Sequence, residues 1–147
     1  MKQFKELFNP LPGCHFLHVN LVRNDITSML QDMVDGVDGE LKVVEYDGEK
    51  HRLDQPFRTP PRDKDIVILQ DILSSHKHFE MLLKIVYTTL ANTAEIIILE
   101  KKGMMDIEKT KELLLKYEFR TPNYIADILD GYDLVIAKKM HMWGNGL

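Results

Sequence analysis

Two short runs of consecutive apolar residues constrain the fold of this chain more than any other feature. Residues 66–69 and 96–99 contain only isoleucine, valine and leucine. A strand with one solvated face alternates apolar and polar side chains, whereas an unbroken apolar run is typical of a strand covered on both faces. In a parallel sheet, helices provide that cover. The two runs therefore predict a parallel sheet between layers of helices.

Segments with helical spacing separate the strand-like runs. Apolar side chains recur at helical intervals in residues 26–34, 79–90 and 106–117. The first segment has Asn24 or Asp25 as an N-cap, and Gly36 as a stop signal. Because strand-like and helical segments alternate, the sequence predicts an α/β fold. The predicted strands are residues 16–22, 41–46, 66–69, 96–99 and 134–137.

The alternation breaks near the end of the chain. Residues 124–128 and 132–139 are both strand-like, and only Leu129, Asp130 and Gly131 separate them. Asp-Gly between two such runs is a hairpin signal. We therefore expect the sheet to finish with an antiparallel strand.

The segment between the second and third predicted strands is short and rich in proline. Residues 47–64 include Pro56, Pro60 and Pro61 and several charges, so no long helix fits there. Residues 51–53 are compatible with a short strand. Asp47-Gly48 is equally compatible with a local hairpin to residues 41–46.

Length and charge limit the classes of function. A chain of 147 residues has room for one domain, and its net charge of −4 disfavours non-specific binding to nucleic acid or anionic lipid. Cys14 is the only cysteine, which excludes an internal disulfide and fits a reducing, cytoplasmic location. The apolar runs are too short to span a bilayer, so no membrane association is expected.

The order of these elements resembles that of the class I S-adenosylmethionine-dependent methyltransferases. The resemblance implies a Rossmann-like, doubly wound and mostly parallel sheet, with a C-terminal antiparallel strand, in a single methyltransferase-like domain over residues 1–147. It also implies a fold shortened between the second and fourth strands. Residues 16–27 resemble the first strand and cofactor turn of the family, residues 43–47 its second strand, 65–73 its fourth, 94–100 its fifth, and 132–139 its terminal strand.

The resemblance implies S-adenosylmethionine as the cofactor and assigns residues to it. Asn20, Val22 and Asn24 stand where the family has glycines, and asparagine tolerates the left-handed backbone better than most residues. Val22 is β-branched and fills space, which favours the alternative of a packed turn without ligand. Glu45 follows the turn by about 20 residues, the offset of a ribose-binding carboxylate, although a solvated charge is the alternative. Asp54 resembles the acidic residue near the adenine amine.

Gln70 and Asp71 follow a predicted strand and are expected to face the methyl acceptor, because ligands of doubly wound sheets bind beyond the carboxyl ends of the strands. Methyl transfer depends mainly on positioning, so it requires no catalytic triad. The sequence therefore predicts a methyltransferase-like protein with an unknown small-molecule or protein acceptor. The alternative is a degenerate, non-catalytic member that acts as a binding or oligomeric partner.

Three further features have two interpretations each. Residues 140–147 place the only tryptophan beside two methionines, which is typical of a self-association patch of a homo-oligomer or of a packed strand. His76 and His78 lack a matching third ligand, so we expect surface histidines and no metal site. The pairs Lys101-Lys102 and Lys138-Lys139 form either a basic rim for an anionic substrate or a solvated face.

Overall fold

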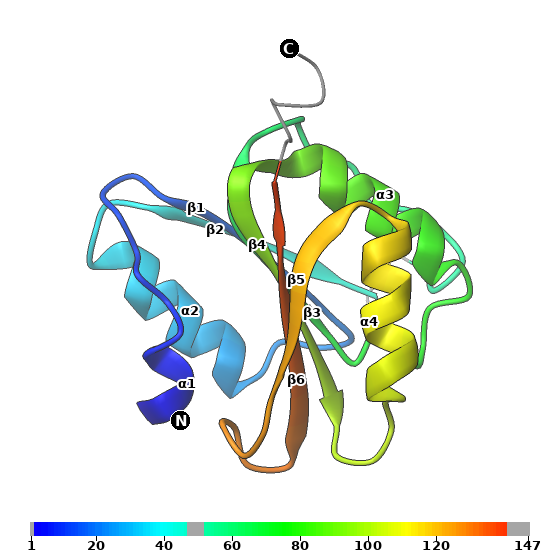
Figure 1. Cartoon of the computed structure of the whole chain (residues 1–147). Helices are drawn as coiled ribbons and strands as arrows, with labels where there is room; N and C mark the ends of the chain where they lie inside the picture. Colours follow the sequence, from blue (N-terminus) through cyan, green and yellow to red (C-terminus); the bar gives the residue numbers. More distant parts are fainter. Residues whose placement is uncertain (1, 47–51, 141–147) are drawn as a thin grey trace.

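The computed structural model describes residues 2–46 and 52–140 (Figure 1). In the sheet, the strands lie in the order β2-β1-β3-β4-β6-β5. The elements in chain order are α1 (Lys2–Lys5), β1 (His15–Asn20), α2 (Asp25–Asp35), β2 (Glu40–Glu45), β3 (Lys64–Gln70), α3 (Phe79–Thr89), β4 (Leu90–Lys101), α4 (Ile107–Lys116), β5 (Phe119–Ile125) and β6 (Tyr132–Lys139).

The sheet has a parallel part and an antiparallel end. Strands β2, β1, β3 and β4 are parallel, and β6 lies antiparallel between β4 and β5. This arrangement confirms the predicted α/β fold with its C-terminal antiparallel strand. The hairpin is also confirmed, and Gly131 in its turn has a φ of +78°, which glycine adopts without strain. The strand before the turn was misplaced, because β5 covers 119–125 and not 124–128.

The connection from β2 to β3 comprises residues 46–63, of which 46 and 52–63 are described. Within the described part of this connection, residues 52–63 form no strand, so the expectation for Arg52 and Leu53 was wrong. Leu53 instead packs against the core, and the Tyr46 hydroxyl donates to the carbonyl of Gln55 at 2.9 Å. The alternative hairpin at Asp47-Gly48 lies outside the described residues.

Helices cover both faces of the sheet (Figure 1). Helices α1 and α2 lie on one face, where Phe4 and Leu30 pack against apolar side chains of β1, β3, β4 and β6. Helices α3 and α4 lie on the other face, where Leu83 and Leu114 belong to a second core cluster. The central strands are thus buried on both sides, which explains their unbroken apolar runs.

Local signals determine where the helices begin and end. Asn24 is the N-cap of α2 and Gly36 is its C-cap, as predicted. Asn24 accepts from the amide of Ile26, and Thr27 completes a capping box that was not predicted. Helix α3 leads directly into β4 without a loop, so β4 is longer than the apolar run that predicted it. The first strand is shorter than predicted and ends at Asn20, which leaves Leu21 and Val22 in the turn.

The chain leaves β1 toward β2 on one side and returns to β3 on the other side. Connections that diverge in this way open a crevice at the carboxyl ends of the two central strands, where doubly wound proteins bind ligands. The fold therefore directs attention to the ends of β1 and β3. Among the described helices, none has the length and apolar character needed to cross a membrane.

Candidate functional site

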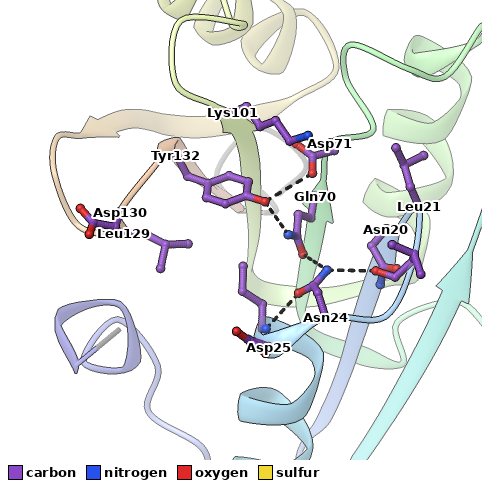
Figure 2. A pocket seen from close by; sticks show the side chains of 12 residues that line it. Asn20, Leu21, Asn24, Asp25, Gln70, Asp71, Lys101, Leu129, Asp130 and Tyr132 are labelled. Carbon is purple, nitrogen blue, oxygen red and sulfur yellow. Dashed lines mark hydrogen bonds between the residues drawn. The ribbon is translucent and has the colours of Figure 1, made fainter.

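A pocket of about 630 Å³ lies at the carboxyl ends of β1 and β3 (Figure 2). Its volume falls within the range of about 300–1,000 Å³ that is usual for small-molecule sites. The start of α2, the end of β4 and the turn before β6 complete its wall. The pocket thus occupies the crevice at which the strand order changes.

This pocket is lined by five residues that were predicted from the sequence to form a site. They are Asn20, Val22, Asn24, Gln70 and Asp71. The fold brings them together because β1 and β3 are paired in parallel, so the turns that follow them lie at the same edge. Glu45 and Asp54 are not among the lining residues.

The turn after β1 does not need glycine. Asn20, Val22 and Asn24 are not among the described residues with positive φ, and Asn24 has a φ of −150°. The expectation that asparagine preserves a left-handed backbone here was therefore wrong. Val22 is 58% exposed at the pocket wall, so its β-branched side chain neither strains the turn nor is buried in the pocket.

A buried histidine that the sequence analysis missed lies beneath the pocket. His18 on β1 is fully buried, and its Nε2 lies 2.8 Å from Oε1 of Gln70. Its Nδ1 lies 3.2 Å from Nδ2 of Asn20 and 3.0 Å from the hydroxyl of Thr27. An amide oxygen accepts and an amide nitrogen donates, so Nε2 carries the proton of a neutral ring. Burial lowers the pKa of His18 to about 4.

Gln70 connects this histidine to the pocket. Its Oε1 also accepts from Nδ2 of Asn24 at 3.1 Å, and its Nε2 donates to the hydroxyl of Tyr132 at 3.0 Å (Figure 2). The Tyr132 hydroxyl lies 3.5 Å from a carboxylate oxygen of Asp71. Side chains from β1, the start of α2, β3 and β6 are thus fixed to one another at the pocket.

One acceptor in the pocket wall has no partner. Asn20 is 1% exposed, and its Oδ1 makes no hydrogen bond within the described chain, whereas its Nδ2 donates to His18. A buried amide oxygen without a donor costs about 1–3 kcal/mol. Because Asn20 is a lining residue, this unpaired acceptor lies in the wall of the pocket.

Carboxylates dominate the charge of the pocket. Asp25, Asp71 and Asp130 line it, and among the described lining residues Lys101 is the only cation. Figure 2 shows Lys101 beside Asp71, with Asp130 on the far side of Tyr132. This balance favours a ligand with net positive charge.

The two predicted carboxylates outside the pocket have basic neighbours. Glu45 pairs in register with Asn20, and its Oε1 accepts from Nε of Arg23 at 2.8 Å. Oδ1 of Asp54 lies 3.5 Å from Nε of Arg52. Lys101, predicted as part of a basic rim, lines the pocket, whereas the sequence analysis missed Tyr132 in its wall and the buried His18 beneath it. A polar residue in an otherwise buried strand was the available signal for His18.

The predictions of surface histidines and of solvated lysines are wrong for His76 and Lys139, which are buried. His76 is buried, its Nε2 lies 3.2 Å from the carbonyl of Gln55, and its Nδ1 accepts from the amide of His78, so it is not a surface residue. No group of three metal-ligating side chains occurs among the described residues. Lys139 is buried and donates to the carbonyls of Tyr87 and Leu90.

The two lysine pairs also lie too far apart for one basic rim. Lys101 is paired with Tyr132 at the carboxyl end of β4, whereas Lys138 is paired with Glu95 toward the other end. Of the predicted self-association segment, Met140 is exposed, and residues 141–147 lie outside the described part of the chain.

No protein-family model matches this chain, and no curated protein matches it in sequence. Solved structures match it in fold. Phosphoethanolamine N-methyltransferase 2 of Haemonchus contortus, in complex with S-adenosyl-L-methionine, superposes with a TM-score of 0.71 at 11% identity. This match covers 95% of the present chain and 52% of the other, so the chain spans about half the length of that enzyme.

Two smaller proteins match over most of their length. An S-adenosylmethionine-dependent methyltransferase of Aquifex aeolicus has a TM-score of 0.63 at 12% identity, with 95% of this chain and 89% of the other covered. A second, from Mesorhizobium loti, has a TM-score of 0.62 at 10% identity, with 93% and 96% covered. The chain therefore has the Rossmann-like fold of class I methyltransferases.

Proposed function

We propose that the pocket at the ends of β1 and β3 binds S-adenosylmethionine and that the chain is a methyltransferase domain. The observation that carries this proposal is the position of the pocket. It lies at the change of strand order, in a fold shared with S-adenosylmethionine-dependent enzymes, and five residues predicted from the sequence line it.

The chemistry of the pocket wall fits this ligand. S-Adenosylmethionine carries a sulfonium, an ammonium and a carboxylate, and is therefore net positive. The unpaired Oδ1 of Asn20 and the carboxylate of Asp25 are acceptors for the ammonium, and Lys101 is a cation for the carboxylate. Asp71 adds negative charge for the sulfonium.

Glu45 is the proposed ligand of the ribose hydroxyls. It lies beside Asn20 in the paired strands, and a carboxylate accepts from two neighbouring hydroxyls at once. In the present conformation, Arg23 holds one of its oxygens. Binding of the ribose therefore requires Arg23 to share or release Glu45. Asp54, with Arg52 as its neighbour, is the proposed contact of the adenine amine.

When bound, S-adenosylmethionine supplies an electrophilic methyl group on a positively charged sulfur. The chain contributes orientation, because the bonds among His18, Gln70, Asn24 and Tyr132 fix four elements around the pocket. Holding two reactants in line is by itself a large part of the catalysis of such a transfer.

A non-catalytic binding domain is the second candidate function. The pair between Arg23 and Glu45 favours it, because a carboxylate that already has a partner gains less from a ribose. The short connection between β2 and β3 favours it as well, because it leaves little chain to cover the adenine of a cofactor.

Loss of the Glu45 carboxylate is expected to weaken binding of S-adenosylhomocysteine by about 10- to 100-fold, because charge-assisted hydrogen bonds contribute about 1.5–3 kcal/mol. Isothermal titration calorimetry of the Glu45→Ala variant measures this. Glu40→Ala is the matched control, since Glu40 is an exposed residue at the other end of the same strand. Arg23→Ala removes the partner and keeps the carboxylate, so its affinity should be equal to or higher than that of the unmodified protein.

Unchanged affinity in Glu45→Ala would remove Glu45 from the site. Binding by the unmodified protein should also raise its thermal stability, by about 2.7 kcal/mol at a ligand concentration of 100 times the dissociation constant. If neither S-adenosylmethionine nor S-adenosylhomocysteine binds at millimolar concentration, the non-catalytic function is supported instead.

A further inference from the structure

The charge of the pocket exceeds what the proposed cofactor needs. Three carboxylates line it, from Asp25, Asp71 and Asp130, against the ammonium of Lys101. S-Adenosylmethionine has one more positive than negative group, so its binding leaves part of this negative charge without a partner.

We propose that the methyl acceptor of this pocket is a small amine that binds as a cation. The inference rests on the proposed function, since it assigns the acceptor to the part of the pocket that the cofactor leaves. Asp130, Leu129 and Tyr132 form that part, and Figure 2 shows them on the opposite side of Asn24 from Asn20.

The side chains there match the two ends of such an amine. Leu129 is buried and offers an apolar wall, and Tyr132 offers an aromatic ring, which attracts a cation to its face. Asp130 is an exposed lining residue and attracts a cation from solution. An anionic acceptor would instead meet three carboxylates and a single lysine.

Asp71 is held in place at the inner end of this region. Its backbone has a φ of +58°, an uncommon conformation for a residue with a side chain, and its amide donates to the carbonyl of Leu99 at 2.9 Å. Its Oδ2 lies 3.5 Å from the hydroxyl of Tyr132, which Gln70 orients.

Methyl transfer requires that the amine nitrogen first lose a proton. The bound ammonium gives one proton to water, while the carboxylate of Asp71 holds the nitrogen, which leaves a neutral amine with a free electron pair. That pair forms a bond to the methyl carbon while the bond between carbon and sulfur breaks, and the electrons of the broken bond stay on sulfur. The products are a methylated ammonium and S-adenosylhomocysteine.

Three probes of the same shape and different charge test this inference. They are 2-phenylethylamine, 2-phenylethanol and 3-phenylpropanoate, each titrated by NMR at neutral pH into the protein saturated with S-adenosylhomocysteine, so that no reaction is needed. We expect the amine to bind at least about tenfold more tightly than the alcohol, and the carboxylate to bind most weakly.

Single substitutions test which carboxylates bind the amine. Asp71→Asn and Asp130→Asn should each weaken binding of the amine by about tenfold and leave binding of the alcohol unchanged. Asp32→Asn is the matched control, because it makes the same charge change on α2 away from the pocket.

Two results would overturn the inference while the proposed function stands: S-adenosylhomocysteine binds and the three probes bind equally, or the amine binds equally to all variants. If S-adenosylhomocysteine does not bind at all, the proposed function fails, and the assignment of an acceptor fails with it.

Discussion

Acidification from pH 7 to pH 4 is expected to lower the free energy of unfolding by about 3 kcal/mol through His18 alone. The pKa of this histidine falls from 6.5 to about 4 on folding, because the ring is buried. Between these two values the unfolded chain binds a proton that the folded chain does not bind. Stability therefore rises with pH across this window and is lost as the pH falls.

Urea denaturation at several pH values measures this effect. The His18→Gln variant keeps a donor toward Gln70 but has no side chain that titrates at this position, so its stability should be less sensitive to acid. At pH 7 it should be less stable than the unmodified protein. His15→Gln is the control, since His15 lies on the same strand and is partly exposed. Equal pH dependence in His18→Gln and the unmodified protein would contradict the assignment.

Replacement of Gln70 by leucine is expected to cost about 3 kcal/mol of stability. Gln70 is 3% exposed, and its Oε1 accepts from both His18 and Asn24. The substitution keeps the approximate size of the side chain but leaves Nε2 of the buried His18 without an acceptor, which costs about 1–3 kcal/mol, and it leaves Nδ2 of Asn24 with the carbonyl of Val22 alone. Because the wall of the pocket loses its link to Tyr132, ligand affinity should fall as well.

Gln70→Glu distinguishes the hydrogen bonds from packing. It keeps an acceptor for His18, and its negative charge raises the pKa of the histidine, so acid sensitivity should decrease. In Gln70→Leu the histidine stays buried without that acceptor, so acid sensitivity should persist. If the two variants lose the same stability at pH 7 and have the same pH dependence, Gln70 acts through packing alone.

Features governed by neighbouring residues could be predicted from the sequence. The caps Asn24 and Gly36 of α2 and the hairpin turn at Gly131 depend on a few adjacent residues, and all three are present. The ends of predicted strands also identified Gln70 and Asp71, because parallel strands bring their carboxyl ends to one edge.

The contacts that complete the site depend on residues far apart in the chain. The bond between His18 and Gln70 joins positions 52 apart, and that between Gln70 and Tyr132 joins positions 62 apart. Both follow from strand order and register, which local patterns do not determine. The burial of His76 could not be predicted for the same reason, because its ring packs against Tyr46, which follows β2 and is 30 residues away in the chain.

Binding of the cofactor in the pocket between the ends of β1 and β3 can be observed residue by residue. The ¹⁵N-labelled protein is titrated with S-adenosylhomocysteine and followed through its backbone amides by NMR. We expect saturable shifts at Asn20, Asn24, Asp71 and Lys101, with an affinity that falls in Gln70→Leu. Absence of shifts at millimolar ligand, or shifts confined to residues outside this pocket, would contradict it.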